Sequence, residues 1–226
     1  MGVSHRKEKE KEIRRNDIID AAEEVFFSKG YEAATMDDVA KKAEFSKRTV
    51  YVYFNSKEQL HFEIMVRGYR LMIERIETSL AKQQDMNALE KIKRIGLTLY
   101  QFNIDFPDYF DAIMSYENSE KDFDEGVTDQ SKEECYALGE SLFGYLRSTL
   151  EEGIKEGSLR SNIDIISTAI IIWSFTLGLF NTLAKKKNYF ENYHQKYSED
   201  LINEGLSMMM KMVEKTNGGN ENEEKE

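Results

Sequence analysis

Apolar residues recur at spacings of three and four along most of the chain, which is the period of an amphipathic α-helix. The first such segment runs from about Glu8 to Lys29, and Gly30 is its expected C-terminal stop. The single proline, Pro107, fits the first turn of a helix. Later helices are expected at about 87–105, 107–117, 129–156, 163–187 and 194–215. The pattern predicts an all-α protein.

Two short helices are predicted between residues 35 and 54. Thr35 is a favourable N-cap, and Asp37 and Asp38 follow it in the first turn, where the helix dipole stabilises carboxylates. Ser46 is a second N-cap, and it opens a segment of about two turns that ends near Phe54. Because a turn of about three residues separates them, the two segments make a helix-turn-helix.

A long helix follows this motif. Ser56 and Gln59, three residues apart, form a capping box, and apolar residues continue at helical spacing from Leu60 to Leu80. This helix leaves the N-terminal module and enters the rest of the chain. We therefore predict a three-helix module over residues 1–55, a larger helical domain over 56–216 and a poorly ordered acidic tail over 217–226.

The net charge of −11 argues at first against nucleic acid as a partner, because DNA affinity depends on neutralising phosphates. The charge is unevenly distributed, however. Residues 1–60 carry twelve Lys and Arg and twelve Asp and Glu, so residues 61–226 account for the whole excess of acid. Between positions 41 and 57 a single acid, Glu44, is outnumbered by five bases, Lys41, Lys42, Lys47, Arg48 and Lys57. The helix-turn-helix therefore has a local basic patch.

The second short helix has the chemistry of a recognition helix. Such a helix must present hydrogen-bond donors from its first turns to base edges in the major groove. Lys47, Arg48 and Thr49 occupy those positions after the Ser46 cap. Arg and Lys can bind guanine, and a hydroxyl can bind several bases or a phosphate. For any one of these residues, a solvent-exposed charge or a packing role is the alternative.

The segment TMDDVAKKAEFSKRTVYVYFNSKEQL, residues 35–60, closely resembles the DNA-binding module of the TetR family of bacterial repressors. The small residue Ala40, the apolar Val50, the run from Tyr51 to Phe54 and the Ser-Lys pair that opens the next helix have the order and spacing of that family. The resemblance covers about residues 13–62. Beyond these residues only the number and lengths of the helices match.

The resemblance implies that Thr35, Tyr53 and Lys57 contact the DNA backbone, which sets register without reading sequence. It also implies that Tyr51 contacts a base or a phosphate. The complete predicted DNA-binding set is Thr35, Ser46, Lys47, Arg48, Thr49, Tyr51, Tyr53 and Lys57.

One residue departs from the family pattern. Glu44 stands in the turn where the family often has glycine, which relieves a left-handed backbone. A glutamate there predicts mild strain or an altered turn.

The segment from Ile165 to Ala184 contains no charged residue and, at twenty residues, approaches the length of a membrane span. Its polar residues and the lack of a second span favour a helix buried on two faces instead. One apolar stripe includes Ile166, Ile170 and Phe180, and a second includes Ala169 and Ile172, with Gly178 allowing close helix approach. We predict a homodimer through about 163–187 and 194–215, as in the TetR family, and no membrane partner. A core helix of a monomer is the alternative.

Aromatic side chains in the second domain suit a ligand pocket. We predict an apolar effector, and the domain's acidity favours a cationic or neutral one. The same side chains would also make an ordinary core. The candidate ligand-binding residues are Tyr100, Phe102, Phe106, Phe110, Met114, Tyr136, Phe143, Tyr145 and Trp173.

Other classes of protein are disfavoured. The single cysteine, Cys135, excludes an internal disulfide, and no spacing suits a metal, a phosphate-binding loop or a nucleophile with its base. We therefore expect no cofactor and no enzyme activity. The charged N-terminal residues do not resemble a secretory signal, so a cytoplasmic location is expected.

The resemblance and the motif together predict a transcriptional repressor. In this prediction a homodimer binds a near-palindromic operator in double-stranded DNA, and a small molecule releases it. Two alternatives stay open: a helical interaction protein with a vestigial DNA module, and a constitutive DNA-binding regulator without an inducer.

Overall fold

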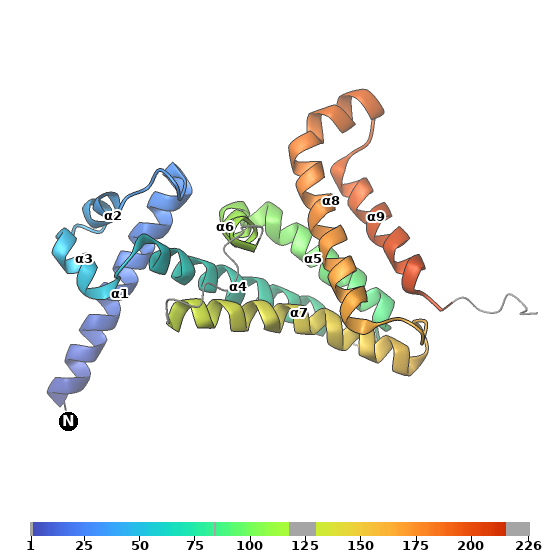
Figure 1. The fold of residues 1–226 in the computed structure, drawn as a ribbon, viewed down its shortest axis with the longest axis horizontal. Coiled ribbons are helices and arrows are strands. Elements are labelled where there is room, and N and C mark those ends of the chain that lie inside the picture. Colours follow the sequence, from blue (N-terminus) through green and yellow to red (C-terminus); the bar gives the residue numbers. More distant parts are fainter. Residues whose placement is uncertain (1, 84, 118–129, 216–226) are drawn as a thin grey trace, which may run out of the picture. The chain divides into compact units, whose positions relative to one another are not determined.

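The computed structural model of the protein describes residues 2–83, 85–117 and 130–215 (Figure 1). In these residues the backbone forms nine α-helices and no β-strand, which confirms the predicted all-α fold. The helices are α1 (Gly2–Lys29), α2 (Met36–Lys42), α3 (Lys47–Tyr53), α4 (Lys57–Ala81), α5 (Ala88–Asp105), α6 (Pro107–Glu117), α7 (Gln130–Glu156), α8 (Ile165–His194) and α9 (Ser198–Val213).

Three of the predicted helices, now α5, α6 and α7, have their ends within one residue of the expected positions. Local signals define these ends. Asn87 and Glu90 form a capping box before α5, with the Glu90 amide donating to Asn87 Oδ1 at 3.0 Å and the Asn87 amide donating to Glu90 Oε2 at 2.9 Å. Pro107 opens α6, and Gly157, with φ of +82°, follows the end of α7.

Three other predicted boundaries were wrong. Helix α1 begins at Gly2 instead of Glu8, so the charged N-terminal run is helical. Helix α8 continues to His194, past a local break at Lys186 (φ −116°, ψ 15°). Gln195, with φ of 52°, then ends α8, and α9 starts only at Ser198. The segment between the helices predicted at 107–117 and 129–156 lies outside the described residues, and so does the predicted tail over 217–226.

The chain divides into two compact units. The first comprises Met1–Leu71 and Phe106–Gly139, and the second comprises Met72–Asp105 and Glu140–Glu226. This division differs from the predicted sequence segments of 1–55 and 56–216, because α4 and α7 each contribute residues to both units. The predicted segments describe functional domains and stay a prediction.

The core of the first unit joins the three N-terminal helices to the start of α4. Ile18, Ala22 and Phe26 of α1 pack with residues of α2 and α3. Val39, Val50 and Leu60 are fully buried, and Phe54 is nearly so. This core is continuous and apolar, so the helix-turn-helix is held as a rigid body on α1 and α4.

The second unit packs α5 against α9 and α8 against α9. Two glycines mark close approaches between these helices. A Cβ at Gly96 of α5 would lie 2.8 Å from Leu206 of α9, and one at Gly205 of α9 would lie 2.8 Å from Leu179 of α8. A Cβ at Gly178 would meet no described atom of the chain within 4 Å, and the close approach expected there between two subunits stays a prediction.

Helix α8 has one buried and one exposed apolar face. Ala169, Ile172, Thr176, Phe180 and Leu183 are buried, at the three- and four-residue spacing of a single helical stripe. The expected grouping of Phe180 with Ile166 and Ile170 was therefore wrong. The large apolar residues Ile166, Ile170, Ile171 and Phe175 are exposed, as are Met208 and Met212 of α9. By length and composition α8 could also cross a membrane.

Candidate nucleic-acid interface

The first turn of α2 is held by a capping box. The Asp38 amide donates to the Thr35 hydroxyl at 3.2 Å, and the Thr35 amide donates to the Asp38 carboxylate at 2.9 Å. The ammonium of Lys29 also donates to Asp38, at 2.7 Å. The Lys29 bond, followed by the Thr35 bonds, lowers the pKa of Asp38 to about 2. The Thr35 hydroxyl, a predicted DNA contact, is therefore exposed but already bonded within the cap.

The turn between α2 and α3 has a left-handed residue at Glu44, with φ of 57°. The amide of Phe45 donates to the Ala40 carbonyl at 3.0 Å, and that of Glu44 donates to the Lys41 carbonyl at 3.3 Å. These two bonds are the Schellman pattern, which places its C′ residue in the left-handed region. The structure thus confirms the backbone expected at Glu44.

Helix α3 is capped by Ser46, whose hydroxyl accepts a bond from the Thr49 amide at 3.1 Å and lies 2.8 Å from the Thr49 hydroxyl. Its inner face is anchored by Val50, which is fully buried, and Phe54, just beyond the helix, is 1% exposed. Because these two residues lie four apart, the side chains at 48 and 52 must lie on the opposite, outer face, and the side chain at 51 lies at its edge.

The outer face of α3 presents a cation, a phenol and an aliphatic side chain. Arg48 is exposed and has no hydrogen bond or ion pair with any described residue. Tyr51 is 43% exposed and Val52 is 71% exposed. Val52 was not among the predicted DNA contacts, although an exposed branched side chain on a recognition helix can contact a thymine methyl group.

Lys47 lies beside this face and forms an ion pair with Asp37 of α2 at 2.7 Å. The hydrogen bond to Asp37 is the largest cause that raises the pKa of Lys47. Both side chains are more than half exposed, and such surface pairs contribute little stability. Lys47 can therefore exchange the carboxylate for a phosphate at small cost.

Lys57 and Tyr53 are directed into the protein. The Lys57 ammonium donates to the carbonyls of Tyr31, Glu32 and Ala34 at 2.7, 3.3 and 3.1 Å. It also lies 4.3 Å from the centre of the Tyr31 ring. An ammonium has three protons, so these carbonyls use its full donor capacity. Tyr53 is half-buried against the core. Both residues were predicted DNA contacts, and the structure assigns Lys57 a bonding role inside the domain.

His61 lies next to this lysine, one helical turn further along α4. Its ring centre is 4.4 Å from that of Tyr31 and 6.3 Å from that of Phe26. Its Nδ1 atom is buried and has no hydrogen-bond partner within the described part of the chain. Burial, followed by the charge of Lys57, lowers the pKa of His61 to about 4.

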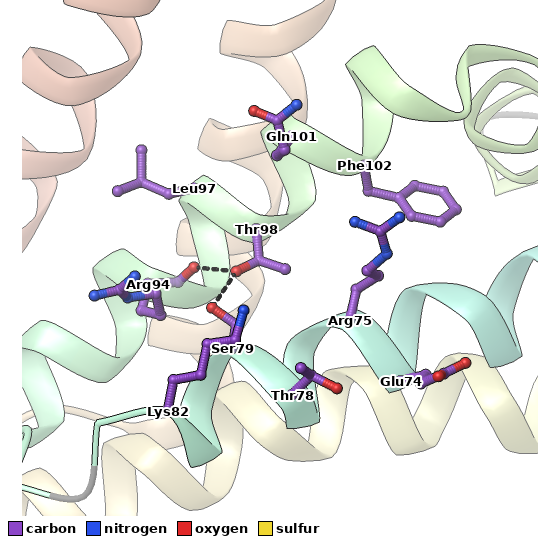
Figure 2. Close-up of a pocket in the computed structure, with 10 residues that line it drawn as sticks. All are labelled: Glu74, Arg75, Thr78, Ser79, Lys82, Arg94, Leu97, Thr98, Gln101 and Phe102. Carbon is purple, nitrogen blue, oxygen red and sulfur yellow. Dashed lines mark hydrogen bonds between the residues drawn. The ribbon is translucent and has the colours of Figure 1, made fainter.

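The predicted ligand-binding residues are divided between the two units. Four belong to the first unit, Phe106, Phe110, Met114 and Tyr136, and five belong to the second, Tyr100, Phe102, Phe143, Tyr145 and Trp173. Tyr100 packs on Phe180 with ring centres 5.5 Å apart, and Trp173 contributes to an apolar seam with very little free volume. Phe102 lines a cavity of about 510 Å³ in the second unit (Figure 2).

Residues 18–64 match the profile of the family described as bacterial regulatory proteins, tetR family. A relative, the HTH-type transcriptional regulator YhgD of Bacillus subtilis, is 27% identical over 150 residues, which are 65% of this chain and 72% of that protein. FadR of Bacillus subtilis, solved with stearoyl-CoA, superposes with a TM-score of 0.67 at 19% identity, covering 87% of this chain and 98% of that one.

A second similar structure is AibR in complex with isovaleryl coenzyme A and operator DNA. It superposes with a TM-score of 0.60 at 20% identity, covering 86% of this chain and 97% of that one. At such identities the likeness shows a shared fold. The profile match spans the end of α1, both helices of the motif and the start of α4, and it includes the exposed side chains of α3. Residues 18–64 therefore form a helix-turn-helix module of the tetR type, and the whole chain shares the fold of regulators that carry this module.

Proposed function

We propose that this protein is a repressor that acts in the bacterial cytoplasm, binds a near-palindromic operator as a homodimer and is released by an acyl-CoA. DNA binding is supported by the outer face of α3, where Arg48, Tyr51 and Val52 are exposed. The other face of this helix is buried in the core. Arg48 can donate two bonds to a guanine, and Val52 can contact a thymine methyl group.

The exposed apolar faces of α8 and α9 support the dimer. Ile170, Ile171, Met208 and Met212 are each more than half exposed in the single chain. Burial of such side chains contributes about 25 cal/mol per Å² of apolar surface, which favours association of two copies. A two-fold dimer presents two recognition helices to half-sites about one DNA turn apart, and a palindromic operator matches that symmetry.

The ligand class comes from proteins of the same fold. FadR was solved with stearoyl-CoA and AibR with isovaleryl coenzyme A, so this fold accepts long and short acyl chains on the same headgroup. An acyl-CoA is an anionic amphiphile. It therefore differs from the cationic or neutral effector favoured by the sequence, while its acyl chain keeps the expected apolar character.

Chain continuity supports coupling between the ligand and the DNA. Helix α4 begins at Lys57 beside the motif and continues without interruption to Ala81 in the second unit. In the first unit, Tyr109 of α6 donates to Glu23 of α1 at 2.7 Å, and Arg67 of α4 binds the same carboxylate at 3.1 Å. A rearrangement in the second unit reaches the motif through α4, and coupling of this kind typically amounts to about 1–3 kcal/mol.

The test begins with selection of genomic fragments that the protein retains, followed by anisotropy titration of the selected duplex. We expect operator binding that an acyl-CoA weakens by about 5- to 150-fold, the range that matches this coupling. Tight binding that no acyl-CoA changes would indicate a constitutive regulator. Failure to retain any specific duplex would indicate an interaction protein with a vestigial motif.

A further inference from the structure

A cavity of about 510 Å³ lies between the second half of α4 and α5, wholly within the second unit. Its volume is in the range of small-molecule sites, about 300–1,000 Å³. Figure 2 shows Arg75 and Lys82 extending from the α4 side toward α5, from which Arg94 comes. The remaining lining residues are Glu74, Thr78, Ser79, Leu97, Thr98, Gln101 and Phe102.

The charge of this cavity is unlike that of the surrounding chain. Its lining has three basic side chains and one acidic one, Glu74, whereas residues 61–226 carry nineteen bases against thirty acids. Three cations around one cavity, against a single carboxylate, attract an anion into it. The cavity therefore favours a negatively charged occupant.

The basic side chains are poorly neutralised by the protein itself. Lys82 has no hydrogen bond or ion pair with any residue in the described ranges. Arg94 donates to Gln83 Oε1, a neutral amide oxygen, at 3.1 Å. Arg75 lies 3.4 Å from Asp105, whose carboxylate also accepts a bond from Gln101 at 2.8 Å. Most of the donor capacity of Lys82 and Arg94 is thus available to a ligand.

A second cavity provides an internal comparison. It lies in the first unit, and it has two arginines, Arg15 and Arg70, in its lining. Each of them forms an ion pair with a glutamate of the same lining, Arg15 with Glu63 and Arg70 with Glu134. That site is internally neutralised, so the excess positive charge between α4 and α5 is not a general property of cavities in this protein.

The other side chains of the cavity add neutral hydrogen-bonding groups and an apolar wall. The Thr98 hydroxyl lies 3.0 Å from that of Ser79 and 2.8 Å from the Arg94 carbonyl, so these hydroxyls are held in place (Figure 2). Leu97 and the nearly buried Phe102 supply apolar surface. Phosphate groups are bound by donors of this kind: the guanidinium groups of arginines, the ammonium of a lysine and hydroxyl groups held in place.

We propose that Arg75, Lys82 and Arg94 form a phosphate-binding subsite that holds the anionic headgroup of the effector. This inference rests on the proposed function for the identity of that effector, because coenzyme A carries phosphates and its acyl chain does not. The subsite assigns recognition of the headgroup to α4 and α5. Since α4 also begins beside the recognition helix, a headgroup bound here acts directly on the helix that continues into the motif.

The experiment is calorimetric titration of the full-length protein with coenzyme A, stearoyl-CoA and stearate, which carries the chain without phosphates. The test variant is Lys82→Gln combined with Arg94→Gln, and Lys82→Gln alone serves if the double variant does not fold. Lys155→Gln is the matched control, since Lys155 is an exposed lysine of the same unit that does not line the cavity.

We expect the double variant to bind coenzyme A and stearoyl-CoA about 10- to 100-fold more weakly, since bonds to charged groups are the strong ones. Stearate binding stays unchanged, and the control behaves as wild type. Equal affinity of wild type and double variant for both coenzyme A and stearoyl-CoA, or no binding of either by wild type, overturns the subsite.

Measurements of operator release, and titrations with other phosphate compounds, distinguish the subsite from ligand-relieved repression and identify the source of the phosphates. If the double variant loses coenzyme A but no acyl-CoA releases operator DNA, the subsite stands and ligand-relieved repression fails. If stearoyl-CoA releases operator equally from wild type and double variant, repression stands and the subsite fails. Binding of inorganic pyrophosphate or ADP as tightly as coenzyme A, with the same sensitivity to the variant, assigns the subsite to free phosphates or nucleotides.

Discussion

Lys57→Met tests whether this lysine stabilises the DNA-binding domain or contacts DNA. The substitution keeps most of the aliphatic stem and removes the ammonium that bonds the carbonyls of Tyr31, Glu32 and Ala34. These carbonyls lie in the connection between α1 and α2, so Lys57 ties the start of α4 to that connection. Loss of the ammonium leaves all three carbonyls without this partner.

The expected loss of stability follows from these contacts. A hydrogen bond to a charged group contributes about 1.5–3 kcal/mol, but the bond to the Glu32 carbonyl is long, at 3.3 Å, and exposed, so that carbonyl can recover water. The Tyr31 ring adds about 0.5–1 kcal/mol through its cation–π contact. We expect a total loss of about 2–4 kcal/mol in the free energy of unfolding, which for a chain of this size lowers the Tm by about 5–15 °C.

Thermal and urea unfolding followed by circular dichroism measure this loss. Lys41→Met is the control, because Lys41 is an exposed lysine of the same domain whose ammonium makes no bond with any described residue. The reasoning is refuted if Lys57→Met unfolds like wild type but binds all DNA sequences more weakly. That result would restore the phosphate contact predicted from the sequence.

Four further outcomes are expected. The pKa of His61 falls from 6.5 to about 4 on folding, so the unfolded chain binds a proton first as pH drops, and about 3 kcal/mol of stability is lost between pH 6.5 and 4. His61→Phe should make the free energy of unfolding less dependent on pH in this range. An unchanged pH dependence would contradict the assignment. Glu44→Gly should raise the free energy of unfolding by about 0.5–1 kcal/mol, since glycine adopts φ of 57° without steric cost, and a loss of stability in urea titration would argue against strain there. Arg48→Ala should weaken operator binding by about 1–3 kcal/mol and spare random duplex, as measured by anisotropy; equal effects on both would make it a phosphate contact. Ile171→Glu should give a monomer in sedimentation equilibrium while the fold is kept, and a dimer that persists would place the interface elsewhere.

The sequence alone was enough for features that depend on neighbours a few residues apart. The helix ends at Asn87, Pro107 and Gly157, the two capped helices of the motif and the left-handed backbone at Glu44 all arise from local hydrogen bonding and steric restriction. The recognition helix belongs to this group as well, because its caps and its buried Val50 determine which residues face outward.

Only the tertiary structure determines which groups the ends of long side chains contact and which elements pack together. Lys57 reaches carbonyls more than twenty residues earlier in the chain, which no local pattern reveals. The aromatic residues expected around one pocket are distributed over two packing units, because apolar spacing gives a helix its inner face but not its neighbour. The cationic cavity arises for the same reason. Arg75 and Arg94 belong to helices that look separately like ordinary amphipathic segments, and their charges lie around one space only after α4 and α5 have packed.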